Sequence, residues 1–103
     1  MSVEINVTGE VVTAYLSGEL DHHTARLVRE EIDNAIELNM PTLLVLDFGS
    51  VSFMDSSGIG LVMGRYRSLQ KTGASLHITN TPPLINKMLK LAGIEKLAKL
   101  EER

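Results

Sequence analysis

The sequence predicts a single α/β domain over residues 1–103, with helices packed on a mixed β-sheet in the order β-β-α-β-α-β-α-α. Three observations predict this class. An alternating hairpin is followed by strands and helices in turn, which is the pattern of helices packed on a mixed sheet. Hydrophobic residues make up 44% of the 103 residues, enough for one core without disulfide or metal staples. No repeat, linker or low-complexity segment divides the chain.

The first strand is predicted from hydrophobic alternation, and the second from the turn that precedes it. Residues 3–7 alternate apolar and polar side chains, which is the period of a half-buried strand. A tight turn at residues 9–10 leads into a second strand over residues 11–16, and we expect residues 17–18 to end it. The N-terminal segment is therefore a hairpin.

A helix and a central strand are expected next. Asp21 is placed to cap a helix whose apolar residues recur at helical spacing and which Asn39 and Pro41 end. Residues 42–48 are almost continuously apolar, as expected of a central strand covered on both faces. We expect residues 49–52 to form a loop after that strand.

The second half of the chain predicts a helix over residues 55–72 and a short strand over residues 75–79. Thr81-Pro82 then reads as a cap followed by proline at the first helical position, opening a third helix that Gly93 closes. Residues 94–100 are expected to form a final amphipathic turn or short helix.

Composition excludes several classes of function. The chain has no cysteine, which removes disulfides, thiolate catalysis and zinc–thiolate sites. Its net charge is −3 with no basic run, so we expect no direct nucleic-acid partner. The N-terminus carries no signal peptide pattern, and the apolar runs are too short to span a bilayer. We therefore expect a cytoplasmic protein without a membrane partner.

The junction of the central strand and the second helix carries the most informative residues, Ser56 and Ser57. The N–H groups of a helix's first turn lack internal partners, and the peptide dipoles add positive charge there. An anion on either serine would be well placed, and the neighbouring Asp55 makes the position sensitive to added negative charge. This combination suggests a covalent switch, although either serine could simply be the helix N-cap.

Glycines at positions 58, 60 and 64 follow the serines. A glycine in a helix interior costs roughly 0.5–1 kcal/mol relative to alanine, so three of them indicate a compensating contact. We expect another backbone to approach this helix closely, either from the domain's own sheet or from a partner protein.

Other chemistries fit the serine segment less well. The phosphate-loop motif is absent, and the spacing of Gly58, Gly60 and Gly64 misses the dinucleotide fingerprint by one residue. A serine-hydrolase nucleophile turn would need glycine at position 54, where Met54 stands. We predict that the protein is not an enzyme, and keep binding of a nucleotide or phosphate ligand as the second hypothesis.

Two further groups of polar residues have ordinary explanations. Asp21, His22 and His23 could be metal ligands, but neighbouring residues at a helix start point in different directions and no further ligands stand at a supporting spacing. We predict neither a metal nor a cofactor. Arg65 and Arg67 are expected to lie on a solvated helix face, with their stems over apolar surface. Arg65 could instead pair with an acidic group of a partner.

Two segments of the chain resemble a known family. Phe-Met-Asp-Ser-Ser-Gly-Ile-Gly at residues 53–60, followed by Gly-Arg-Tyr at 64–66, is similar to the phosphorylation segment of the anti-sigma-factor antagonists, bacterial proteins of the STAS domain class. Gly-Glu-Leu-Asp-His-His-Thr-Ala at residues 18–25 is similar to the sporulation-type members. The resemblance implies one STAS domain over residues 1–103, in agreement with the element order read from the pattern.

The resemblance also implies a mechanism. The protein would bind an anti-sigma factor that is an ATP-dependent serine kinase and thereby free a sigma factor. Phosphorylation of Ser56 would release the antagonist, and a serine phosphatase would restore it. An antagonist of a stress-response pathway is the alternative, although residues 19–24 favour the sporulation type. The partner-contacting residues that the resemblance implies are Asp21, His22, His23, Met54, Asp55, Ser57, Gly58, Ile59, Gly60 and Arg65.

Overall fold

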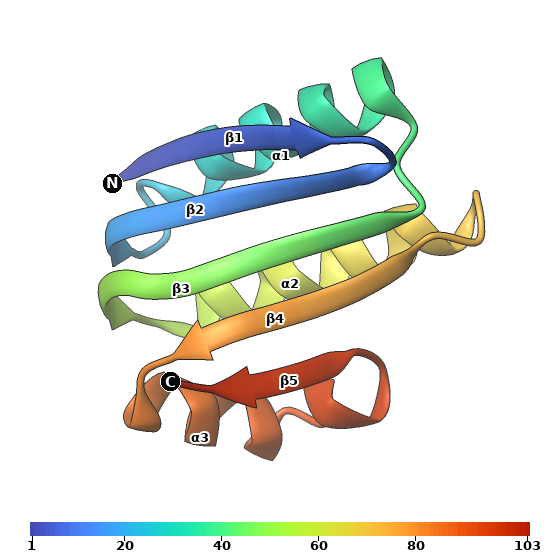
Figure 1. The fold of residues 1–103 in the computed structure, drawn as a ribbon. Coiled ribbons are helices and arrows are strands. Elements are labelled where there is room, and N and C mark those ends of the chain that lie inside the picture. The colour runs from blue at the N-terminus through green and yellow to red at the C-terminus, as the bar shows by residue number, and fades with distance from the viewer.

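In the computed structural model, which describes residues 1–103, a five-stranded sheet carries three α-helices on one of its faces (Figure 1). The elements are β1 (Ser2–Thr8), β2 (Val11–Leu20), α1 (Ala25–Asn39), β3 (Leu43–Met54), α2 (Ser56–Gln70), β4 (Ser75–Thr81), α3 (Pro83–Leu91), the short 3₁₀-helix η1 (Ile94–Lys96) and β5 (Lys99–Glu102). The predicted α/β class and element order are confirmed, and β5 is an addition that the sequence did not reveal.

The sheet is mixed, and its topology brings three chain turns together. The strand order is β1-β2-β3-β4-β5; β1 pairs antiparallel with β2, and all other neighbours are parallel. Because β2, β3 and β4 run in the same direction, their carboxyl ends meet at one edge of the sheet (Figure 1). The turns that follow Leu20, Met54 and Thr81 therefore lie at that edge, where parallel α/β sheets commonly bind their ligands.

The hydrophobic core lies between the sheet and the helices. Alternate residues of β2 and β3 point to the helices and are fully or almost fully buried: Val12, Ala14, Leu16, Leu44, Leu46 and Phe48. The opposite face of the sheet carries no helix (Figure 1), and Tyr15 on that face is 45% exposed. The expectation that the central strand is covered on both faces is therefore wrong.

Strands β2 and β3 are both longer than predicted. We expected residues 17–18 to end β2 and residues 49–52 to form a loop, but both segments continue as paired strands. The pairing Gly18↔Val51 and Leu20↔Met54 persists across two irregularities in the register. A bulge tolerates small and polar residues that weaken a regular ladder, and Gly18 has a φ of +97° that favours glycine.

The helix ends follow from local signals. Helix α1 ends at Asn39, where Met40 adopts a left-handed φ of 45° ahead of Pro41, as predicted. Pro82 is the N-cap of helix α3, and the helix begins at Pro83; both positions are one residue later than predicted. Neither these helices nor α2 is both long and apolar enough to cross a bilayer.

The fifth strand is polar and lies at the edge of the sheet. Its sequence, Lys-Leu-Glu-Glu, carries no apolar alternation, and only Leu100 within it is partly buried. Contacts to β4 and α3 hold it instead: the Thr81 hydroxyl donates to the Glu101 carbonyl at 3.1 Å, and Asn86 Nδ2 donates to Glu102 Oε1 at 3.1 Å. We expected Leu100 in a final helix; it lies in this strand.

Candidate functional site

The turn between β3 and α2 is organised by Asp55. This residue is the N-cap of α2, and its Oδ1 accepts a hydrogen bond from the Ser57 N–H at 2.8 Å. Its carbonyl accepts from the Gly58 N–H at 3.0 Å. Neither serine is therefore the N-cap. Ser56, the first residue of the helix, is exposed, and Ser57 is half-buried.

The turn between β2 and α1 is organised by Asp21 in a similar way. Its Oδ1 accepts from the His23 N–H at 2.9 Å and the Thr24 N–H at 3.1 Å, while its own N–H donates to Thr24 Oγ1 at 3.0 Å. The prediction that Asp21 caps the helix is wrong, because the N-cap is Thr24. The carboxylate instead stabilises the turn that precedes the helix.

The electrostatics of this turn favour a charged carboxylate. The Thr24 N–H bonded to it lowers the pKa of Asp21 below the ordinary value of 3.8, against a smaller opposing effect of desolvation. The His23 N–H, the Thr24 hydroxyl and the His23 ring lower this pKa further. Asp21 is thus an anion at neutral pH, fixed in position beside the carboxyl ends of the strands.

The two aspartate turns are neighbours in space. Leu20 pairs with Met54 at the ends of β2 and β3, and the Asp55 N–H donates to the Leu20 carbonyl at 3.2 Å. The structure therefore brings the two segments that resembled the family to one edge of the sheet. Phe53 lies beside them and is 51% exposed, an apolar surface residue that we did not single out although it begins the recognised segment.

The two histidines lie on the outside of the first turn. His22 and His23 are exposed, and their ring centroids are 4.0 Å apart with the rings tilted by 37°. No group of three or more His, Asp or Glu side chains in the chain is arranged to hold a metal ion. The imidazoles are therefore surface groups available to a partner.

The glycines of α2 have different surroundings. A Cβ on Gly58 would lie 2.3 Å from Cγ and 2.4 Å from Sδ of Met54, whereas a Cβ on Gly60 or Gly64 would meet nothing within 4 Å. The predicted approach of another backbone is therefore wrong: at Gly58 a side chain of the domain itself comes close, and at Gly60 and Gly64 nothing does. Met54 is only 5% exposed, so our expectation that it contacts a partner is wrong. Gly60 remains on the surface, and Ile59 is partly buried against the core.

Arg65 is buried, which corrects the prediction of a solvated side chain. It is 6% exposed, and its Nε lies 2.9 Å from Asp33 Oδ1 of α1. This contact is an ion pair without hydrogen-bond geometry, because neither Nε nor Nη1 has a hydrogen-bond partner. Burial lowers the pKa of Arg65, Asp33 raises it, and the charges of Arg29 and Arg67 lower it further.

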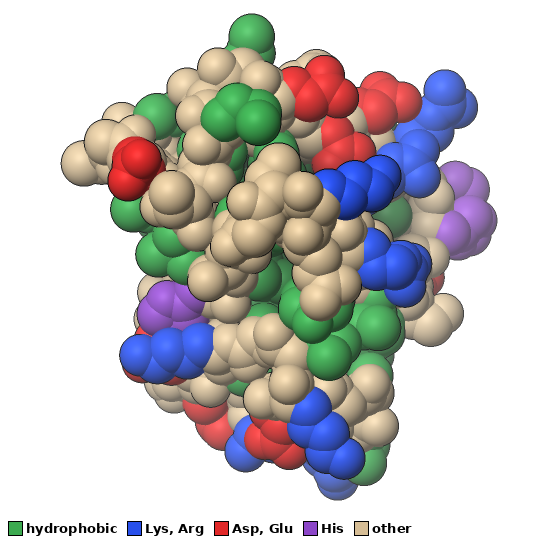
Figure 2. All heavy atoms as spheres, turned by 90° about the vertical axis from the view of Figure 1, so that its right-hand side faces the viewer, with side chains coloured by type: hydrophobic (Ala, Val, Ile, Leu, Met, Phe, Trp, Pro, Cys, Tyr) green, Lys and Arg blue, Asp and Glu red, His purple; other side chains and the backbone are tan.

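A groove of about 440 Å³ runs between α1 and α2 from the site. His22 and Ser57 line it, together with Gly60 and Gly64. Four of the chain's five arginines also line it: Arg26, Arg29, Arg65 and Arg67. Figure 2 shows Lys and Arg side chains gathered next to histidine side chains along one flank of the molecule. We call this feature the arginine groove.

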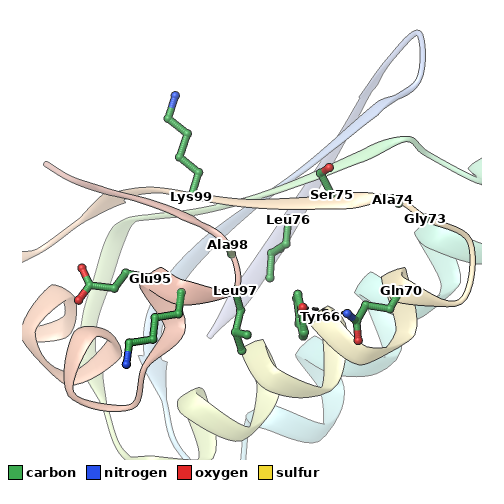
Figure 3. A pocket seen from close by; sticks show the side chains of 11 residues that line it. Tyr66, Gln70, Gly73, Ala74, Ser75, Leu76, Glu95, Leu97, Ala98 and Lys99 are labelled. Atoms are coloured by element: carbon green, nitrogen blue, oxygen red, sulfur yellow. Dashed lines mark hydrogen bonds between the residues drawn. The ribbon is translucent and has the colours of Figure 1, made fainter.

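A second hollow, of about 740 Å³, lies between α2, the start of β4 and the segment around η1 (Figure 3). Leu76 and Leu97 point into it, whereas Glu95 and Lys99 point away. On the helical wall of the hollow, Gln70 Nε2 donates to the Tyr66 hydroxyl at 2.8 Å. Since α2 rises about 1.5 Å per residue, this hollow is separated from Ser56 by most of the helix.

Comparison with known proteins places the chain among regulators. The family model described as STAS domain matches residues 2–103. An anti-sigma F factor antagonist of Paenibacillus polymyxa is 34% identical over 97 residues, covering 94% of this chain and 83% of the relative.

Two solved structures of one protein are also similar to the chain. The anti-sigma factor antagonist SpoIIAA in its unphosphorylated form superposes with a TM-score of 0.83 at 35% identity, covering 96% of this chain and 87% of that one. The Bacillus cell fate determinant SpoIIAA in the phosphorylated form gives a TM-score of 0.77 at 35% identity, with 96% and 90% covered.

Proposed function

Because the chain belongs to the STAS domain family, we propose that it is an anti-sigma-factor antagonist that is switched by phosphorylation of Ser56. The unmodified protein binds an anti-sigma factor that is also a serine kinase, and so frees a sigma factor. Phosphorylation releases the partner, and a serine phosphatase reverses the modification. The protein acts by binding, as a cytoplasmic regulator, and catalyses no step itself. The relative's description as an anti-sigma F factor antagonist favours the sporulation type over a stress-response antagonist.

This proposal rests on the different roles of Asp55 and Ser56 at the start of α2. Asp55 supplies the capping bond of α2, so the fold does not need the Ser56 hydroxyl for that purpose. Ser56 is exposed at the end of the molecule where the two aspartate turns meet. A kinase can therefore reach the hydroxyl without opening the domain. That a related antagonist has been solved in phosphorylated and unphosphorylated forms supports the same conclusion.

The capping hydrogen bond of Asp55 also changes the expected position of a phosphate group on Ser56. We expected the first-turn N–H groups to receive the anion, but Asp55 already accepts from the N–H groups of Ser57 and Gly58. A phosphoserine carries about −1.5 to −2 charges and would meet the Asp55 carboxylate as a like charge. The phosphate therefore points to solvent, where a docked partner would have to strip its water. Release of the partner follows from repulsion and desolvation at the surface.

The contact surface that we propose comprises the exposed and half-buried residues of the two turns. These are Asp21, His22, His23, Asp55, Ser57, Ile59 and Gly60. Gly58 supports this surface by making room for Met54, and Arg65, which is paired with Asp33, lines the adjoining groove between α1 and α2.

Phosphorylation with the anti-sigma factor kinase of the same organism tests the proposal. After incubation with kinase and ATP, we expect the intact mass to rise by one phosphoryl group, and peptide mapping to place it on Ser56. The Ser56→Ala variant should stay unmodified while Ser57→Ala is modified normally. A phosphate mapped to Ser57, or no complex between the unmodified protein and the kinase, would contradict the proposal.

Binding of a nucleotide or phosphate ligand is the second candidate, and the arginine groove is the observation that favours it. The turn itself does not resemble a phosphate cradle, because Asp55 accepts from two of its N–H groups, those of Ser57 and Gly58. Direct titration of ATP and GTP against the isolated protein separates the candidates: the antagonist needs no nucleotide of its own.

A further inference from the structure

The arginine groove concentrates positive charge next to the serine turn. The chain as a whole has a net charge of −3, yet four arginines and no Asp or Glu line this groove. Two of them are paired within the chain, Arg26 with Glu30 at 3.1 Å and Arg65 with Asp33 at 2.9 Å. Arg29 and Arg67 have no ion pair. The groove therefore holds uncompensated positive charge next to Ser57.

Arg65 is a positive charge of the groove that is buried between the helices. Its side chain is almost fully buried, and its Nε and Nη1 have no hydrogen-bond partner although they are removed from water. An unsatisfied buried donor of a charged group is costly, so such groups normally meet a partner. Arg65 lines the groove, and a ligand with acceptor oxygens in the groove would supply that partner.

The chemistry of the chain itself indicates carboxylates. Both arginines of the groove that are paired meet carboxylate oxygens, those of Glu30 and Asp33. A guanidinium fork matches the geometry of a carboxylate, to which it can donate two parallel hydrogen bonds. The arginines come from both helices that flank the groove, which suits several acidic side chains on one segment. Gly60 and Gly64 leave open space along α2 for that segment to approach.

We propose that the arginine groove is the docking site for an acidic segment of the partner protein, whose Asp and Glu side chains pair with Arg29, Arg65 and Arg67. This inference rests on the proposed function and adds the chemistry of the partner's surface to it. It also gives the switch a further physical basis. Ser57 lines the groove, so a phosphate on the adjacent Ser56 would place about −1.5 to −2 charges at its mouth. Such a charge repels an acidic segment that comes within a Debye length of it, about 8–10 Å.

Charge reversal with a matched control tests the docking site. We compare Arg29→Glu/Arg67→Glu with Lys71→Glu/Lys96→Glu; all four residues are exposed, and both pairs change the net charge equally. Lys71 ends α2 and Lys96 lines the distant hollow, so the control pair lies away from the groove. Against the anti-sigma factor kinase at low salt, we expect about a tenfold or greater loss of affinity for the arginine pair and less than about twofold for the lysine pair. The difference should shrink as salt is added.

A peptide probe tests the groove independently of the kinase. Hexaglutamate should shift the Gly60 and Gly64 amide signals and the Arg65 Nε–H signal of the wild type, and should fail to do so in Arg29→Glu/Arg67→Glu. Equal affinity of the arginine and lysine variants for the kinase would overturn the docking site while leaving the proposed function intact. The absence of peptide-induced shifts, or shifts caused by inorganic pyrophosphate but not by the peptide, would likewise overturn it. Failure of the wild type to bind the kinase would instead contradict the proposed function.

Discussion

Two aspartates directly follow neighbouring parallel strands, and they have different roles in the turns that begin there. Asp21 follows β2 and Asp55 follows β3, and each accepts a hydrogen bond from the N–H two residues further on, at 2.9 and 2.8 Å. Asp55 is the N-cap of its helix, whereas Thr24 takes that position three residues after Asp21. The same local hydrogen bond is therefore followed directly by a helix after Asp55, and by a longer turn after Asp21.

The difference decides what each turn presents to a partner. The Asp55 turn leaves a serine as the first helical residue, exposed and without a capping duty. The Asp21 turn presents two exposed histidines before its helix begins. We infer that one turn carries the switch and the other carries constant contacts, and the following variants test this assignment.

Overpacking beneath both turns should have the largest effect on stability. A Cβ at position 58 would meet Met54 at 2.3 Å and Leu20 at 3.2 Å, the residues that end β3 and β2. We expect Gly58→Leu to reduce the free energy of unfolding by about 1–3 kcal/mol in thermal or chemical denaturation. Gly60→Leu is the control, because open space surrounds Gly60 and leucine favours a helix over glycine by roughly 0.5–1 kcal/mol.

The same pair of variants separates folding from binding. Gly60→Leu should keep or gain stability and should weaken binding to the anti-sigma factor kinase, because the added side chain projects where the partner would lie. Retained affinity per folded molecule in Gly60→Leu would remove Gly60 from the proposed contact surface.

Removal of the helix cap comes next in size. Asp55→Ala deletes the acceptor of the Ser57 N–H, and loss of an N-cap costs about 0.5–2 kcal/mol. Asp55→Asn should restore most of this stability, since asparagine caps helices equally well. If Asp55→Ala has the same free energy of unfolding as the wild type, the Asp55 cap does not stabilise α2, and it cannot explain why the fold does not need the Ser56 hydroxyl.

Acid should affect the Asp21 turn in a definite direction. The pKa of Asp21 is lowered in the folded protein, chiefly by the bonded Thr24 N–H, so the folded state favours the carboxylate. Its stabilising contribution is fully present above the ordinary pKa of 3.8 and is lost as the pH falls through the lower folded value. The gap in melting temperature between wild type and Asp21→Asn should therefore narrow in this acidic window. A gap independent of pH would contradict the role of the charge.

The smallest effect on stability is expected at the switch itself. Ser56→Ala should change the free energy of unfolding by less than about 0.5 kcal/mol, because Asp55 provides the cap and Ser56 is exposed. The variant should bind the kinase and resist phosphorylation. A marked loss of stability in denaturant would show that the Ser56 hydroxyl has a structural role after all.

The parts of the fold that were predictable have strong local signals. Apolar alternation at Val3, Ile5 and Val7 identified β1, and the serine turn was located at the correct strand–helix junction. The polar ends of β2 and β3 were missed because their pairing with each other, and not their side chains, keeps them extended. Strand β5 was missed for the same reason, as it depends on contacts with Thr81 and Asn86.

The surroundings of single side chains were less accessible to sequence reasoning. Arg65 looks like a surface residue on a helix, and only the packing of α1 against α2 places Asp33 beside it. The arginine groove is likewise formed by two helices that are far apart in the sequence. Met54 was assigned to the surface with the rest of its segment, although the irregular end of β3 turns it into the core and leaves Phe53 exposed.

A comparison of amide chemical shifts between the unmodified and the Ser56-phosphorylated protein tests the central claim most directly. We expect changes confined to the Asp21 turn, residues 53–62 and the adjoining end of the arginine groove, because Asp55 keeps α2 capped while the surface charge changes. Shifts that spread through β4 and α3 would show a rearranged fold and would contradict a switch that acts only at the surface.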